Sequence, residues 1–271
     1  MVNGITLSGL RAFGSGFLIF TDYARGSIRL SSLMDLPVLH IWTHDSISVG
    51  EDGPTHQPIE QLVSLRAIPG MVVIRPSDAN EMVEAYRLAL SLKDRPVALI
   101  CTRQPLPIVD RARYAKASGL AKGGYVLVDP PDGKPDVILI GCGSEIGLCL
   151  QACESLNAER IKTRVVSMPA WTMFDEQDQS YQESVFPPSV SARVTVEESL
   201  AYRVGPVRRT QRGGARRADF WHVGAHEDCR RTFRLYGRAC HSGGKGNAGS
   251  VASTVMRHYR RIKESRRCNL E

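Results

Sequence analysis

Three polar residues stand where apolar runs end. His44 follows PVLHIWT, Arg75 follows MVVI and Arg103 follows PVALICT. Ligands of open parallel sheets bind at the carboxyl ends of the strands, so these side chains can meet at one edge. An imidazole and a guanidinium there suit a phosphate, because guanidinium donates two aligned hydrogen bonds to it. For Arg75 we favour a structural role, since Arg-Pro-Ser-Asp is also typical of a plain strand-to-helix turn.

The most unusual segment is GEDGPTHQP at residues 50–58. Two glycines and two prolines stiffen it, while Glu51, Asp52 and His56 offer acid, base and hydrogen-bonding groups. We therefore predict a site in this loop. A calcium loop of the EF-hand type would need more ligands, and His44 and His56 lack zinc-helix spacing, so we predict no metal site.

Aromatic residues recur every three positions at Phe17, Phe20 and Tyr23. As a bare pattern this is more typical of a core than of a cofactor platform. Residues 141–145 (GCGSE) place glycines and a serine at an expected helix start, which could bind an anion but is more often a tight turn.

The elements that must position these residues alternate apolar strands with amphipathic helices, which predicts two doubly wound α/β units. We expect residues 1–113 to form the first unit, 114–124 a linker, 125–200 an incomplete second unit, and 201–271 a disordered basic tail. The expected strands are 16–20, 37–43, 71–74, 96–101, 125–128, 137–140, 163–167 and 193–196, and the expected helices are 23–34, 59–68, 79–92 and 144–156.

The charge changes abruptly near residue 200. Residues 1–200 carry 18 Lys and Arg against 23 Asp and Glu, whereas residues 201–271 carry 17 against 5. The overall net charge of +7 therefore describes neither part. Seven cysteines form no CxxC pair, which indicates buried thiols in a reducing, cytoplasmic compartment. No apolar run reaches the roughly 18 residues of a membrane-spanning helix, and we predict no membrane contact.

Residues 43–81, THDSISVGEDGPTHQPIEQLVSLRAIPGMVVIRPSDANE, closely resemble the signature of the transketolases. FLIFTDYARGSIRLSSLM at residues 17–34 and VVSMP at residues 165–169 resemble the family as well. The resemblance implies a pyrimidine-binding domain followed by a C-terminal domain. It also implies a cytoplasmic enzyme of the pentose phosphate pathway that uses thiamine diphosphate to transfer a two-carbon ketol unit from a ketose phosphate to an aldose phosphate.

The resemblance also assigns roles residue by residue. Phe17, Phe20 and Tyr23 match the aromatic pocket around the cofactor's aminopyrimidine, which reverses the core interpretation of that pattern. Asp52 matches a residue that binds a substrate hydroxyl, and His56 the histidine near the reacting carbon. His44 and Arg103 match residues that bind the substrate phosphate.

Two departures from the family affect the expected activity. We expect the diphosphate domain, with its Mg²⁺ or Ca²⁺ site, and the glutamate that activates the cofactor to lie upstream of this chain. Residues 1–271 alone are therefore predicted to be inactive. In the tail, a reading frame shifted by one base after about Ala201 permits the family's Phe-Gly-Phe-Thr-Val segment, so we hypothesise a frameshift there.

Several alternatives remain open. The family's active site forms between two subunits, so a homodimer is implied. The chain could also be a half-enzyme that pairs with a separate diphosphate-binding subunit, or a pseudoenzyme whose arginine-rich tail binds nucleic acid. A related thiamine enzyme, such as a deoxyxylulose-phosphate or dihydroxyacetone synthase, would share part of the GEDGPTHQP loop.

Overall fold

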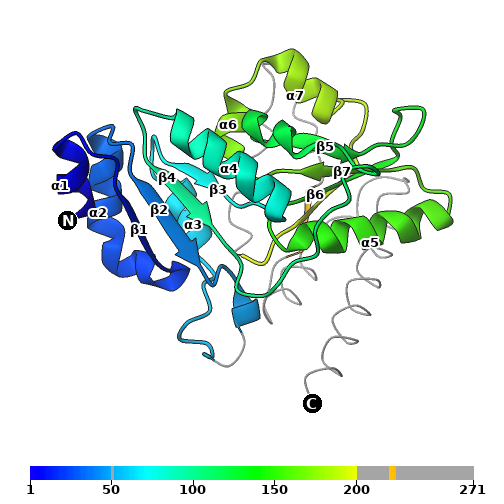
Figure 1. Cartoon of the computed structure of the whole chain (residues 1–271). Helices are drawn as coiled ribbons and strands as arrows, with labels where there is room; N and C mark the ends of the chain where they lie inside the picture. Colours follow the sequence, from blue (N-terminus) through cyan, green and yellow to red (C-terminus); the bar gives the residue numbers. More distant parts are fainter. Residues whose placement is uncertain (50–51, 200–219, 224–271) are drawn as a thin grey trace.

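The computed structural model describes residues 1–49, 52–199 and 220–223, which form two α/β units side by side (Figure 1). The order of elements in the first unit is α1 (Val2–Leu7), β1 (Phe13–Phe17), η1 (Leu18–Phe20), α2 (Thr21–Leu33), β2 (Leu39–Thr43), η2 (Ile47–Val49), α3 (Gln61–Arg66), β3 (Val72–Ile74), α4 (Ala79–Ser91) and β4 (Val97–Ile100).

The first sheet is parallel and has the order β1-β2-β4-β3. Both faces are covered, because alternate residues of β3 and β4 point to opposite sides. Val73 and Ile100 pack with α2 and α3, whereas Val72 and Leu99 pack with α4. Because both faces are buried, the sequences of the strands are continuous apolar runs, as expected for a doubly wound unit.

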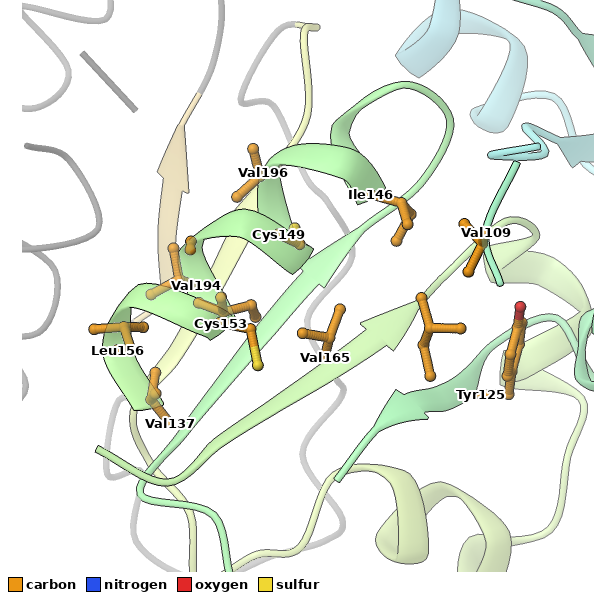
Figure 2. Close-up of a cluster of buried hydrophobic side chains, with 13 residues drawn as sticks. Val109, Tyr125, Val137, Ile146, Cys149, Cys153, Leu156, Val165, Val194 and Val196 are labelled. Carbon is orange, nitrogen blue, oxygen red and sulfur yellow. The ribbon is translucent and has the colours of Figure 1, made fainter. Parts of the chain in front are cut away.

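The second unit consists of η3 (Ala117–Lys122), β5 (Tyr125–Val128), β6 (Val137–Gly141), α5 (Glu145–Ala158), β7 (Thr163–Ser167), α6 (Trp171–Asp175), α7 (Gln179–Val185), β8 (Arg193–Val196) and β9 (Phe220–Val223). Its sheet has the order β5-β7-β6-β8-β9. One face packs on α5 through residues such as Val137 and Cys153 (Figure 2). The other face packs on α6 and α7.

The α/β class is confirmed, and several details of the sequence prediction are corrected. The first strand is β1, three residues earlier than residues 16–20, because the chain turns into η1 at Leu18 and the Thr21 hydroxyl donates to the Leu18 carbonyl at 2.8 Å. The second sheet is mixed, since β5 runs antiparallel to β7. The expected linker contains η3, whose Leu120 is fully buried against α4.

Within the tail predicted to be disordered, residues Phe220–Val223 form β9, which pairs in parallel with β8. The rest of the tail lies outside the described residues. Within the described ranges, no helix is long and apolar enough to span a membrane.

A polar contact between the units starts at the first turn of α4. Asp78 caps this helix by accepting from the Glu81 amide at 2.8 Å, and the Glu81 carboxylate accepts from the Ser77 amide at 2.8 Å. The same carboxylate accepts from the Tyr125 and Ser167 hydroxyls, each at 2.6 Å. One helix start thus contacts both β5 and β7 of the second unit.

Candidate functional site

Aromatic side chains gather where β1 ends and α2 begins. Phe17 ends β1, Phe20 ends η1, and Tyr23 lies in the first turn of α2. The Phe17 and Phe20 rings are parallel within 5° with centroids 5.9 Å apart, and the Phe20 and Tyr23 centroids are 6.1 Å apart. Phe20 is 40% exposed and Tyr23 is 88% exposed. The cluster is therefore an open aromatic surface rather than a core, so a planar ligand could reach it.

His44 lies against this surface. The register of β1 and β2 pairs Phe17 with Thr43, so the residue after β2 arrives beside the end of β1. The imidazole of His44 stacks on Phe17 with centroids 3.7 Å apart, and its Nδ1 is 3.0 Å from the Thr43 hydroxyl. The backbone of His44 has a φ of 59°, in the left-handed region that residues with a Cβ rarely adopt.

The stiff loop brings His56 to the same place. Its amide donates to the Gly53 carbonyl at 3.1 Å, and its Nδ1 is 2.9 Å from the Thr55 hydroxyl. The imidazole meets the rings of Phe17 and Phe20 edge-on, with centroids 6.4 and 5.7 Å apart. The two histidines therefore contact one aromatic surface, although they are far from zinc-helix spacing.

Asp52 and Arg103 are both exposed. Asp52 lies in the described part of the same loop, whereas Glu51 falls outside the described residues. Arg103 follows β4, which pairs with β2, so Arg103 and His44 leave the sheet at the same edge. The structure brings together the aromatic residues, His44 and His56. Asp52 lies on the same loop as His56, and Arg103 on the segment after β4.

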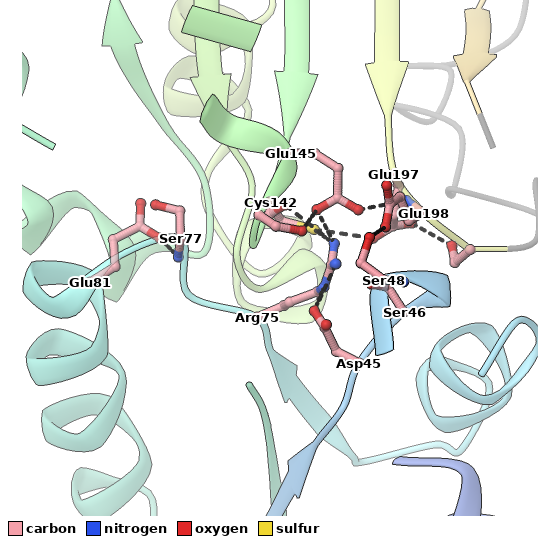
Figure 3. Close-up of polar contacts among 12 residues, drawn as sticks. Asp45, Ser46, Ser48, Arg75, Ser77, Glu81, Cys142, Glu145, Glu197 and Glu198 are labelled. Atoms are coloured by element: carbon pink, nitrogen blue, oxygen red, sulfur yellow. Dashed lines mark hydrogen bonds and ion pairs between the residues drawn. The ribbon is translucent and has the colours of Figure 1, made fainter. Parts of the chain in front are cut away.

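Arg75 has the structural role favoured from its sequence. It is 1% exposed, and its guanidinium forms ion pairs with Asp45 and Glu145, each at 2.7 Å (Figure 3). Nη1 also donates to the Cys142 carbonyl at 3.2 Å. Because Arg75 is enclosed by protein groups, it is not accessible to a substrate phosphate.

A second ion pair lies beside the first. Arg66, at the end of α3, donates to both carboxylate oxygens of Glu197 at 2.8 and 2.7 Å. The Cys142 thiol donates to Glu197 at 3.1 Å. Arg66 belongs to the first unit and Glu197 follows β8 of the second, so this pair also joins the units.

Burial controls the ionisation of these groups. Three carboxylates, those of Asp45, Glu145 and Glu197, face the guanidinium groups of Arg66 and Arg75. Burial raises the pKa of Glu145 to about 7, against the opposing effect of Arg75. Burial alone would also raise the pKa of Glu197, but the adjacent Arg66 holds it well below its usual range.

The sequence analysis missed this network. Asp45 lies in the segment 43–81 and Glu145 in the segment 141–145, but neither has a role assigned from the sequence. The arginine partners of Asp45, Glu145 and Glu197 lie 30 to 131 residues away in the chain. The glycines of residues 141–145, by contrast, do have a structural reason. Gly143 has a φ of 56°, and a Cβ there would lie 2.7 Å from Cζ of Arg75. The Gly-x-Gly segment therefore serves as a tight turn that packs against a guanidinium.

No group of three or more His, Cys, Asp or Glu residues suited to a metal ion occurs within residues 1–49, 52–199 and 220–223. The thiols of Cys101, Cys142, Cys149 and Cys153 are free, and burial raises the pKa of each. Cys142, Cys149 and Cys153 are buried, as predicted, whereas Cys101 is half-buried. The other three lie outside the described ranges.

Comparison with known proteins accounts for both units. Residues 1–109 match the family model of the transketolase pyrimidine-binding domain, and residues 123–234 match that of the transketolase-like C-terminal domain. The second match runs past the charge break at residue 200. A transketolase from Halalkalibacterium halodurans is 51% identical over 197 residues, which cover 72% of this chain and 29% of the relative.

Solved transketolase structures have the same fold as this chain. A Pichia stipitis transketolase in complex with sedoheptulose-7-phosphate has a TM-score of 0.74 at 34% identity, and the match covers 95% of this chain and 36% of that chain. A split-gene transketolase, described as an inactive beta4 tetramer, shares the fold with a TM-score of 0.67 at 23% identity. It is matched over 95% of this chain and 78% of its own length.

The first unit is thus a doubly wound pyrimidine-binding domain with an open aromatic surface, and the second is the C-terminal domain of the same class of enzyme. The chain belongs to the transketolase family. It spans less than a third of the length of the Halalkalibacterium halodurans relative.

Proposed function

We propose that this chain provides the pyrimidine-binding and C-terminal parts of a transketolase, which transfers a two-carbon ketol unit from a ketose phosphate to an aldose phosphate. One observation carries the proposal: Phe17, Phe20, His44 and His56 meet at the carboxyl ends of β1 and β2. Ligands of parallel sheets bind at this position. A cytoplasmic location, predicted from the cysteine usage, is part of the proposal.

The aromatic surface fits the aminopyrimidine end of thiamine diphosphate. Phe17 and Phe20 have parallel rings, and Phe20 and Tyr23 are exposed, so a planar heteroaromatic ring can stack on them. When bound, thiamine diphosphate supplies the carbanion chemistry of the reaction. The role of this chain is to bind and orient the pyrimidine. The diphosphate, and the Mg²⁺ or Ca²⁺ that accompanies it, would be bound by a separate diphosphate domain.

The substrate would be a sugar phosphate, as in the Pichia stipitis complex. His56 would act near the reacting carbon, because its ring lies at the edge of the aromatic surface. Asp52 would bind a sugar hydroxyl, while His44 and Arg103 would bind the phosphate. Binding the phosphate away from the reacting carbon orients the sugar with binding energy from a remote group.

A titration of the full chain with thiamine diphosphate, followed by NMR, tests the pyrimidine site. Stacking contributes about 0.5–1.5 kcal/mol, so Phe20→Leu should weaken binding roughly 2- to 10-fold. Tyr86→Leu is the matched control, since Tyr86 is an aromatic residue of α4 that is 37% exposed. The proposal fails if the control weakens binding equally, or if the cofactor shifts no signal of the aromatic surface.

Turnover assays test the dependence on a second domain. We expect no transketolase activity from the purified chain with thiamine diphosphate and Mg²⁺. Activity should appear when a separately produced diphosphate-binding domain of a relative is added, and His56→Ala should remove most of it. Turnover by the chain alone would contradict this part of the proposal.

A second candidate is a half-enzyme subunit with a natural diphosphate-binding partner. The fold neighbour from a split gene supports this candidate, because the match covers 78% of that chain. Native mass spectrometry distinguishes a homodimer of this chain from a complex with the added domain. A stable complex of both chains, with no homodimer on its own, would favour the half-enzyme.

A further inference from the structure

The candidate site contains one residue in an unfavourable backbone conformation. His44 has a φ of 59°, and a residue with a Cβ in this region needs surrounding contacts to hold it there. Its ring contacts Phe17, but a ring stack alone leaves the backbone free to relax. The next residue, Asp45, is only 3% exposed. Its contacts can therefore constrain the backbone of His44.

Asp45 is held by Arg75. Its Oδ2 accepts from Nε of Arg75 at 2.8 Å and lies 2.7 Å from Nη2. The hydrogen bond and the ion pair both use Oδ2, so they tie the Asp45 carboxylate to the guanidinium through one oxygen. Arg75 follows β3, so the contact connects the segments after two different strands of the first sheet.

Arg75 is in turn held by the second unit. Its Nη1 is 2.7 Å from Oε2 of Glu145 and 3.2 Å from the Cys142 carbonyl. The guanidinium packs on the backbone of Gly143, where a Cβ would come within 2.7 Å of Cζ. The Gly143 amide also donates to the Arg75 carbonyl at 3.1 Å. The second unit therefore fixes both the backbone and the guanidinium of Arg75.

Glu145 is itself rigidly placed at the start of α5. Its Oε1 accepts from the Glu198 amide at 2.6 Å, and its Oε2 is 3.1 Å from the Ser144 hydroxyl. A series of buried contacts thus runs from Glu145 through Arg75 to Asp45 (Figure 3). Asp45 directly follows His44 in the sequence.

We propose that Glu145 is a positioning residue for the candidate site: acting through Arg75 and Asp45, it holds His44 in its left-handed conformation with the imidazole stacked on Phe17. The C-terminal domain would thereby set the geometry of His44 through Arg75 and Asp45. The consequence for phosphate binding rests on the proposed function, whereas the position of His44 does not.

The NMR signal of the His44 imidazole tests the proposal in the full chain at pH 8, where Glu145 is ionised. The ring current of Phe17 shifts this signal, and Phe17→Leu marks its position without the stack. Glu145→Gln keeps the shape of the side chain but removes its charge. We expect it to move the His44 signal at least half of the way to its position in Phe17→Leu. His44→Gln identifies the signal among the seven histidines.

Glu197→Gln is the matched control, because it breaks the other buried ion pair between the units without touching Asp45 or Arg75 through an ion pair. It should leave the His44 signal in place. The proposal is overturned if Glu145→Gln leaves the signal unchanged, or if Glu197→Gln moves it as far. Should Glu145→Gln not fold, Asp45→Asn breaks the last contact of the same series. It should also move the His44 signal, and an unchanged signal would overturn the proposal.

Inorganic phosphate separates this proposal from the proposed function. If the wild-type chain binds phosphate at His44, Glu145→Gln should weaken that binding by about threefold or more. Absence of phosphate binding in the wild type would count against the assigned substrate, while the ring-current shift would still decide whether Glu145 positions His44.

Discussion

Glu197→Gln should make brief local separation of the two units more frequent, while the units stay in contact most of the time. The substitution keeps the shape of the side chain but leaves Arg66, whose side chain is 13% exposed, without its counter-charge. Removing one partner of a buried ion pair costs about 3–5 kcal/mol. A domain is typically stabilised by about 5–15 kcal/mol, so the loss is large without being sufficient to unfold the chain.

The assay is hydrogen exchange of the full chain, read by mass spectrometry. At tenfold per 1.4 kcal/mol, a loss of about 3 kcal/mol should speed exchange roughly 100-fold in the amides that become exposed when the units separate. These amides lie in α3 and in the segment after β8, where Arg66 and Glu197 are located. The central strands β4 and β6 should exchange more slowly in both proteins.

Glu154→Gln is the control, because Glu154 forms an ion pair with Arg113 at 3.0 Å in which both side chains are more than half exposed. Solvent screens such pairs, so this variant should exchange like the wild type. Equal exchange in Glu197→Gln and Glu154→Gln would refute the reasoning. The effect of the Glu197–Arg66 pair should also depend on pH. The pKa of Glu197 is lowered by Arg66, so its contribution should be present at pH 7 and decline as the pH falls below the ordinary value of about 4.3.

Two further predictions concern stability. Burial lowers the pKa of His40 to about 4, so the folded state favours the neutral imidazole, and about 3 kcal/mol of stability should be lost as the pH falls from 7.5 to 4; urea unfolding should show that His40→Gln lacks this loss. Gly123→Ala should lower the melting temperature by several degrees more than Gly133→Ala. Both glycines have a positive φ, but only at Gly123 would a Cβ collide, 2.2 Å from the Phe174 amide nitrogen. Equal melting temperatures would contradict this account.

The sequence predicts the parts of the fold whose signal is local. The strands Tyr125–Val128, Thr163–Ser167 and Arg193–Val196 are found where the apolar runs predict them. The first strand is predicted three residues too late, because the apolar run at residues 17–20 is compatible both with a strand and with a helical turn. The helices α6 and α7 are missed because neither follows a clear apolar period. The antiparallel direction of β5 depends on its pairing with β7, which the composition of β5 does not encode.

The candidate site likewise contains features that the local sequence predicts and features that depend on distant residues. The spacing of Phe17, Phe20 and Tyr23 suits a strand end, a short turn and a helix start, so the three rings gather without long-range contacts. The exposure of these rings depends on the rest of the fold and cannot be read from their spacing. The bare pattern therefore suggests a core. The partners of Arg75 come from distant segments and belong to two units. Only the folded arrangement shows why this arginine is needed.

The contact between the units is built from buried charges, which constrains how the sequence can vary. An apolar contact tolerates one substitution at a time, since a slightly smaller or larger side chain still packs. Replacing Arg75 alone would leave Asp45 and Glu145 as uncompensated buried charges, and replacing Glu145 alone would remove one of the two carboxylates paired with Arg75. These positions are therefore expected to change together or not at all. A chimera that combines this first unit with the second unit of a distant relative should be more stable when the incoming unit also supplies the Glu145 and Glu197 carboxylates.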